Sequence, residues 1–142
     1  MTALVVRQDS IALEPALAAA TAALRHGLDI GVKVNVAVVD VGGHLTAFLR
    51  APGAFLHSIA IAQDKAYTAV SFGMPTGQLY ELIAANPALR DGLIRRERLT
   101  AFAGGFPIMV DGRVVGAIGV SGASEAQDCA CAQAGLAAVG AS

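Results

Sequence analysis

His57 is the residue whose surroundings most favour chemistry. It follows Phe55-Leu56 and precedes Ser58-Ile59, where a helix is expected to begin. An imidazole beside an apolar wall can ligate a metal or transfer a proton near neutral pH, because its unperturbed pKa is about 6.5. A core histidine with satisfied hydrogen bonds explains the same pattern, so both interpretations stay open.

Two cations, Arg50 and Lys65, also occur in apolar surroundings. Arg50 ends an expected strand, and Lys65 lies in an expected helix among Ala, Ile and Tyr residues. Cations in such places pair either with an acidic side chain, here Asp40 or Asp64, or with a carboxylate or phosphate of a ligand. The sequence favours neither alternative.

Two glycine-containing segments allow a close approach to the backbone. Gly104-Gly105-Phe106-Pro107 offers an open main chain beside an aromatic ring, which suits either a ligand or a structural bend. The segment from Gly116 to Gly122 places glycines where a strand usually carries bulky side chains. Either a helix packs tightly there or a flat ligand does.

The standard catalytic and cofactor motifs are absent: there is no GxSxG, phosphate-binding loop, HExxH or dinucleotide fingerprint. Cys129 and Cys131 are two residues apart on an expected helix and point to nearly opposite sides, so we expect two reduced thiols. The N-terminus lacks the features of a signal peptide, and no apolar run approaches about 18 residues. We therefore expect a cytoplasmic protein that does not enter a membrane.

The composition indicates one folded domain over residues 1–142, with 55% hydrophobic and 15% charged residues. This apolar content exceeds what a core of this size needs, so we expect a pocket or a subunit interface, and hence a homo-oligomer. The net charge is −1, with no Trp and no basic cluster, which argues against nucleic-acid binding.

The expected elements alternate between helices and hairpins. Helices are expected over residues 14–28, 58–72 (capped by Ser58), 76–85 (capped by Thr76) and in the C-terminal segment that a Ser124/Gln127 capping box opens. Strands are expected over residues 34–41, 44–50, 100–103, 107–110 and 113–120, with Gly42-Gly43 and Asp111-Gly112 as turns and a charged linker over 90–98. This order predicts an α+β domain with a mainly antiparallel sheet of about five strands.

Several blocks together closely resemble the GlcG/HbpS family, which includes the C-terminal domain of PduO-type proteins and is often labelled haem-degrading. The blocks run from Ala37 to Leu45, Ser58 to Ala69, Phe72 to Thr76, Gly104 to Ile108 and Asp111 to Gly122, followed by Asp128. The resemblance covers about residues 10–139, nearly the whole chain.

The resemblance implies a profilin-like fold, with a five-stranded antiparallel sheet flanked by helices, assembled into dimers or larger oligomers up to octamers. It implies haem binding as the best-described activity. The family-like positions carried over are Arg50, Lys65, Thr68, Phe72, Pro75, Gly104, Gly105 and Pro107. They resemble pocket and scaffold positions.

The chain departs from the family in two places. Many members have an acidic residue between the strand-end Arg and the following Gly, whereas Arg50-Ala51-Pro52-Gly53 has none. Secreted members carry a signal peptide and acidic iron-binding motifs, whereas this chain has only Glu125-x-x-Asp128, which a helix cap explains. The sequence therefore does not favour an iron-sensing role.

Two functions follow as hypotheses, beside a third alternative in which the protein is an oligomeric scaffold with no ligand. In the first, the protein binds a flat, apolar anion such as haem, with His57 as axial ligand, Phe72 and Phe106 as apolar walls, Gly104 and Gly105 at the ligand, and Arg50 and Lys65 on the propionates. In the second, the protein is a cofactor-independent catabolic enzyme (a lyase, isomerase, hydrolase or dehalogenase) acting on a small organic acid. His57 would then transfer protons while Arg50 or Lys65 holds the carboxylate.

Overall fold

The computed structural model describes residues 2–142 and contains five helices and four strands in that part of the chain. The helices are α1 (Leu13–Asp29), α2 (His57–Phe72), α3 (Thr76–Ala84), α4 (Pro87–Leu93) and α5 (Glu125–Ala138). The strands are β1 (Asn35–Asp40), β2 (Leu45–Arg50), β3 (Gly105–Val110) and β4 (Arg113–Ser121), antiparallel in the order β2-β1-β4-β3. The α+β class is confirmed.

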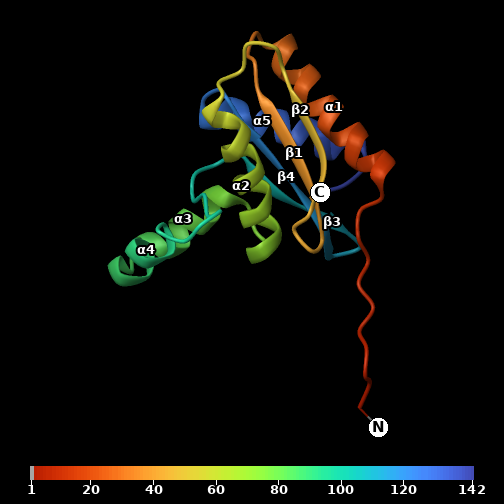
Figure 1. Cartoon of the computed structure of the whole chain (residues 1–142), viewed down its shortest axis with the longest axis vertical. Coiled ribbons are helices and arrows are strands. Elements are labelled where there is room, and N and C mark those ends of the chain that lie inside the picture. The colour runs from red at the N-terminus through yellow and green to blue at the C-terminus, as the bar shows by residue number, and fades with distance from the viewer. Residues whose placement is uncertain (1) are drawn as a thin grey trace.

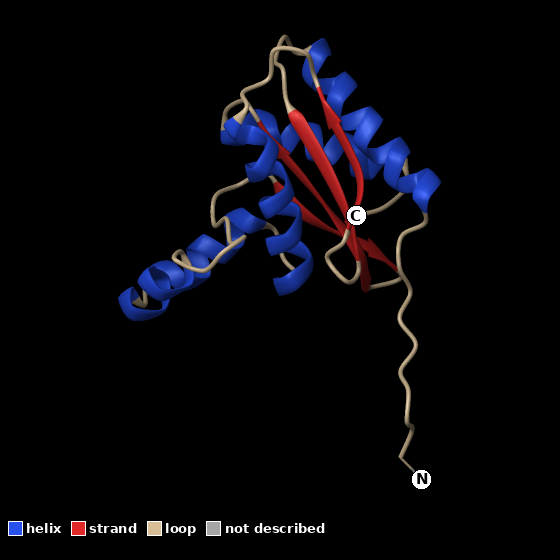
Figure 2. Cartoon of the chain, viewed as in Figure 1, coloured by secondary structure: helices blue, strands red, loops and turns tan. Residues whose placement is uncertain are grey.

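The sheet separates two layers of helices. Helix α2 covers one face, α1 and α5 lie together on the other, and α3 with α4 projects beyond the edge of this body (Figure 1). The main core lies between the sheet and the α1–α5 pair, with Val36, Val38, Ile118 and Val120 at its centre. The strands are thus enclosed by helices on both sides (Figure 2).

The prediction of a fifth strand over residues 100–103 is wrong. This segment forms no ladder, and side chains accept two of its backbone N–H donors. The Thr100 N–H donates to Thr68 Oγ1 at 3.0 Å, and the Ala103 N–H donates to Glu125 Oε1 at 2.8 Å. The alternating pattern predicts a strand, whereas these tertiary contacts hold an irregular segment that leads into β3.

Glycine at position 119 allows α2 to lie directly on β4. A Cβ there would collide with the backbone of Ala62 and Ala66 in the helix. Of the two alternatives for the glycine-rich stretch, a tightly packed helix therefore explains Gly119. This close packing also fixes where Lys65, which lies between Ala62 and Ala66 on α2, enters the interior.

Helix starts confirm one expected cap and correct two others. Ser124 accepts a hydrogen bond from the Gln127 N–H, and the Gln127 side chain accepts one from the Ser124 N–H, as expected for a capping box. Helix α2 begins one residue before Ser58, without a side-chain cap. Thr76 is the first residue of α3, and its hydroxyl instead accepts the Gly105 N–H at 3.0 Å.

Helix α4 extends into the segment expected to be a charged linker, since residues 90–93 are helical. Pro87 stands in its first turn, and the Asn86 side chain accepts the Leu89 N–H at 3.2 Å, so this short helix has both an N-terminal proline and a cap. The next hairpin agrees with expectation, since Asp111 and Gly112 both adopt positive φ between β3 and β4.

Within residues 2–142, none of the helices has the length and apolar character needed to cross a bilayer.

Candidate ligand sites

Lys65 is fully buried and makes two hydrogen bonds through its ammonium group. Its Nζ donates to the Val120 carbonyl at 2.9 Å and to Asp128 Oδ2 at 3.0 Å. The ring of Phe102 lies over the same ammonium, 4.9 Å from Nζ to the ring centroid. The partner of Lys65 is thus Asp128, and the two partners that the sequence suggested, Asp40 and Asp64, are wrong.

The Lys65–Asp128 pair is held on both sides by the fold. Lys65 projects from α2, whereas Asp128 stands in the first turn of α5, where its other oxygen accepts the Ala123 N–H at 3.0 Å. Burial lowers the pKa of Lys65 and raises the pKa of Asp128, because each charged form loses hydration, and their mutual attraction opposes both shifts. The pair therefore joins α5 to α2 across the end of β4.

Gly104 and Gly105 leave the space that the Lys65–Asp128 pair and α2 occupy. Gly104 has a φ of 129°, and a Cβ there would lie 2.6 Å from both Lys65 Nζ and the Val120 oxygen. A Cβ at Gly105 would lie 2.5 Å from the Lys65 carbonyl oxygen. The close backbone approach that the glycine pair permits is thus an approach to Lys65 and α2.

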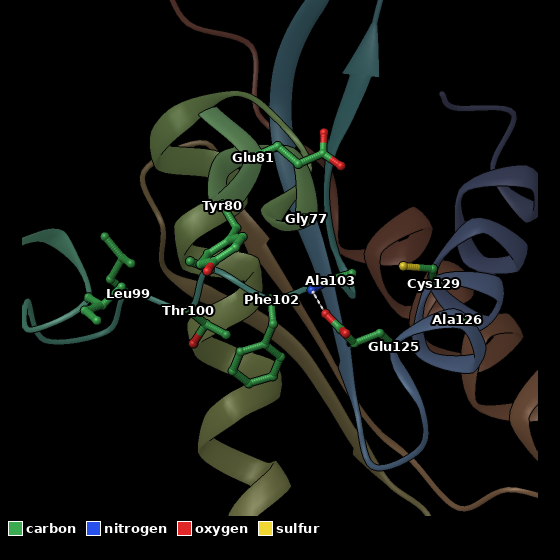
Figure 3. Close-up of a pocket in the computed structure, with 12 residues that line it drawn as sticks. Gly77, Tyr80, Glu81, Leu99, Thr100, Phe102, Ala103, Glu125, Ala126 and Cys129 are labelled. Atoms are coloured by element: carbon green, nitrogen blue, oxygen red, sulfur yellow. Dashed lines mark hydrogen bonds between the residues drawn. The ribbon is translucent and has the colours of Figure 1, made fainter. Parts of the chain in front are cut away.

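A cavity of about 740 Å³ lies on the outer side of Phe102. We call it the α3–α5 cavity, since its walls come mainly from α3, the irregular segment before β3 and the N-terminal part of α5 (Figure 3). Its lining residues are Gly77, Tyr80, Glu81, Ile94, Leu99, Thr100, Ala101, Phe102, Ala103, Glu125, Ala126 and Cys129. The cavity is large enough for a drug-sized molecule.

The α3–α5 cavity combines apolar walls with acidic groups. Tyr80 and Phe102 supply aromatic rings, and Glu81 and Glu125 supply carboxylates. Burial raises the pKa of the Cys129 thiol, an effect that the nearby Lys65 opposes. The Phe102 ring, which lines the cavity, also lies over the Lys65 ammonium.

Arg50 and His57 lie at a different place, at the two ends of the loop over residues 51–56. Arg50 Nη2 donates to the Ala54 carbonyl at 2.7 Å, which ties the guanidinium to the loop. His57 is the first residue of α2 and is exposed, as are Phe55 (69%) and Leu56 (72%) before it. The apolar wall expected around the imidazole is therefore an exposed apolar surface beside it.

Lys33 adds a further cation to this region. Its Nζ would lie 3.0 Å from a Cβ at Gly53, so the side chain rests against the loop. Lys33 and Phe55 also line a hollow of about 270 Å³. We call the exposed region formed by Lys33, Arg50, Phe55, Leu56 and His57 the loop surface.

The two aromatic residues expected as walls of one pocket lie apart. Phe72 ends α2 and lines a small hollow with Tyr67 and Arg96. Phe106 stands in β3, packs against the main core and faces a hollow beside Leu136. The structure thus gathers Lys65, Gly104 and Gly105 in the interior, places Arg50 and His57 at one loop, and separates the two phenylalanines.

Sequence reasoning missed three residues of these sites: Asp128 and Phe102 at the buried ammonium, and Lys33 at the loop surface. Asp128 was attributed to a helix cap and Phe102 to a strand. An Asp in an Ala-rich, apolar helix is a signal for a buried cationic partner, because an unpaired carboxylate is costly to bury. Lys33 gives no such signal, since its position beside Gly53 depends on the fold.

Comparison with known proteins places the chain in a family. The family model described as "Haem degrading protein HbpS-like" matches residues 11–137. An uncharacterized 15.0 kDa protein from Citrobacter freundii, of the dhaT-dhaS intergenic region, is 35% identical over 120 residues, 84% of each chain.

Two solved structures share the fold over almost the full length. A double mutant of HbpS from Streptomyces reticuli is 37% identical with a TM-score of 0.86, covering 96% of this chain and 92% of that one. A structure of a PduOC:heme complex is 30% identical with a TM-score of 0.84, covering 94% of this chain and 97% of that one. With its helices on both faces of an antiparallel sheet and a match over residues 11–137, the chain belongs to the HbpS-like family.

Proposed function

We propose that this protein binds a small molecule, haem or a similar flat anion, at the loop surface. The observation that carries the proposal is the combination on and beside the loop over residues 51–56: an exposed imidazole at His57, exposed Phe55 and Leu56, and two cations that contact the loop, Arg50 at Ala54 and Lys33 at Gly53. The PduOC:heme structure, a relative with the same fold, supports haem as the ligand class.

The residues of the loop surface fit haem chemically. Imidazole is a common axial ligand of haem iron, a guanidinium pairs well with a carboxylate, and apolar side chains cover a porphyrin face. His57 would hold the haem iron through its imidazole, and Arg50 would pair with a propionate. When bound, haem supplies a redox-active iron; the chain supplies the ligand, the counter-charge and the apolar contact.

The α3–α5 cavity fits this ligand less well. Glu81 and Glu125 line it, and both repel propionates. Lys65 is enclosed with Asp128, and Gly104 and Gly105 pack against it. The proposal therefore places none of these residues on haem, and neither Phe72 nor Phe106, which face other hollows.

The loop surface is open in one chain, and we propose that a second copy covers it in a homo-oligomer. Exposed apolar residues support this, since Phe55 and Leu56 stand out from the loop and Leu4, Val5 and Val6 from the N-terminal segment. A cytoplasmic location remains part of the proposal.

Titration with hemin tests the proposed function. The wild type is expected to shift the Soret band to that of a histidine-ligated haem, and His57→Ala is expected to lose this band. His44→Ala is the matched control, because His44 is also exposed but lies beside Asp40, 3.2 Å from ring Nδ1 to the carboxylate. A free-hemin spectrum in the wild type, or an unchanged spectrum in His57→Ala, refutes the assignment.

We do not extend the proposal to a cofactor-independent enzyme. That alternative needs His57 and a cation on one small acid. Of the two cations, Lys65 is hydrogen-bonded to Asp128 in the interior, away from His57. The exposed apolar residues Phe55 and Leu56 beside His57 suit a flat apolar ligand better than a small polar acid.

A further inference from the structure

The Lys65 ammonium has a third donor that the interior does not use. A protonated lysine carries three N–H bonds, and the Val120 carbonyl and Asp128 accept two of them. On its remaining side lies the Phe102 ring, with its centroid 4.9 Å from Nζ. A ring face is a weaker partner than an oxygen, so this donor is available to a better acceptor.

Phe102 separates that donor from the α3–α5 cavity. The ring lines the cavity and is 46% exposed, although it also covers the buried ammonium. The segment that carries it is anchored on both sides, through Thr100 to Thr68 and through Ala103 to Glu125. A change of the Phe102 side-chain rotamer would turn the ring outward while these two anchors hold the backbone in place. Figure 3 shows the ring and the segment that carries it.

The charges around the cavity restrict what can occupy it. Asp128 already neutralises Lys65, and Glu81 and Glu125 add negative charge at the walls. An anionic group beside three carboxylates is disfavoured, whereas an uncharged carbonyl or hydroxyl oxygen can accept the free N–H without repulsion. The aromatic and aliphatic walls suit an apolar body on the same molecule.

We propose that the α3–α5 cavity is a second binding site, for an uncharged apolar molecule with an acceptor oxygen, which displaces the Phe102 ring and bonds to the Lys65 ammonium. This site is separate from the loop surface and takes an uncharged ligand, whereas the loop surface takes an anion. Haem binding at the loop surface neither requires it nor excludes it.

Lysine labelling tests whether the Phe102 ring shields Lys65 from solvent. The chain has only two lysines, Lys33 and Lys65, so the exposed Lys33 is an internal standard. Reductive methylation with formaldehyde, followed by peptide mass mapping, should modify Lys33 quickly and Lys65 slowly in the wild type. In Phe102→Ala the Lys65 rate should rise at least about tenfold, because the reagent no longer waits for the segment to open.

Phe102→Leu is a milder substitution, because it keeps an apolar side chain. Its rate of Lys65 methylation should lie between the rates of the wild type and Phe102→Ala. Circular dichroism identifies the folded variants, and the Lys33 rate corrects for differences in reagent activity between samples. If Lys65 reacts no faster in either folded variant than in the wild type, the ring does not cover it and the proposal fails.

The ligand class is tested with Nile red, an uncharged, flat dye with a carbonyl oxygen whose fluorescence rises in apolar surroundings. The wild type should bind it saturably, and bound dye should slow Lys65 methylation in Phe102→Ala. Ala126→Phe fills the cavity from α5 and should abolish dye binding, whereas Ala138→Phe, also exposed and on the same helix, should not.

Equal dye binding by Ala126→Phe and the wild type, or no binding by the wild type, overturns the second site. These outcomes are independent of the hemin titration, since His57→Ala is expected to bind Nile red like the wild type. Failure of the haem proposal would appear only in the hemin titration, and failure of the second site would appear only in Nile red binding and Lys65 methylation.

Discussion

Asp128→Asn isolates the contribution of the buried ion pair between α2 and α5. Asparagine can still accept the Ala123 N–H, as Asp128 Oδ1 does at 3.0 Å, but its amide nitrogen replaces the Oδ2 that accepts from Lys65 Nζ. The substitution therefore removes the charge and the hydrogen bond to Lys65 together. It leaves the Lys65 ammonium, whose side chain is 1% exposed, without a counter-charge. Removing one partner of such a pair costs about 3–5 kcal/mol, a large part of a typical domain stability of about 5–15 kcal/mol.

Urea denaturation followed by circular dichroism measures this loss. At a typical slope of about 2 kcal/mol per M, the midpoint should fall by about 2 M. Asp9→Asn is the matched control, since it breaks the Asp9–Arg113 pair, whose side chains are 69% and 70% exposed, and it should change stability by less than about 1 kcal/mol.

The double variant Lys65→Met with Asp128→Asn separates a charge effect from a packing effect. It removes the unpaired charge while methionine keeps an unbranched apolar chain, so it should recover at least half of the loss. If the double variant is as unstable as Asp128→Asn, the loss does not come from a stranded ammonium and the reasoning is refuted.

The pH dependence of Asp128→Asn gives a second check. Burial already lowers the pKa of Lys65 from 10.5, and losing Asp128 removes the attraction that opposes this shift. Between the lowered folded pKa and 10.5, the unfolded chain binds the proton and the folded chain does not. The free energy of unfolding should therefore rise with pH in this window, and a flat profile would contradict it.

The remaining predictions concern packing, capping and assembly. Gly119→Ala should lower stability by about 1–3 kcal/mol in thermal melts, because its Cβ meets the α2 backbone, whereas Gly92→Ala, with open space in α4, should be neutral or stabilising; equal effects refute this explanation. Ser124→Ala should cost about 1 kcal/mol in urea denaturation through loss of the α5 cap, and no change would show the cap to be dispensable. Serine substitution of residues 4–6 should lower the mass measured by light scattering if these exposed side chains contribute to an oligomer.

The fold was predicted well where local signals dominate. Helix α1, both hairpins and the α5 capping box follow from periodicity, turn residues and side-chain reach, all of which act over a few positions. The segment over residues 100–103 was misjudged, because Thr68 and Glu125, distant in sequence, take its N–H donors. A local pattern contains no information about such partners.

The candidate site was predicted less completely. The sequence correctly singled out Lys65 as a cation in apolar surroundings, but its partner Asp128 lies 63 positions away. His57 and Arg50 were selected for the same pocket as Lys65. They lie instead at the ends of an exposed loop, because α2 begins at His57 and carries Lys65 two turns further along, into the interior.

The sequence by itself determined the family, the α+β class, most element positions and the residues with unusual chemistry, since these depend on residue type and short-range spacing. Tertiary structure alone decided which of those residues meet. It paired Lys65 with Asp128, placed Phe102 over the pair and left Arg50 and His57 at the surface. The physical reason is that burial and long-range pairing arise when α2 and α5 close on β4, and only that packing determines which charges lose their water.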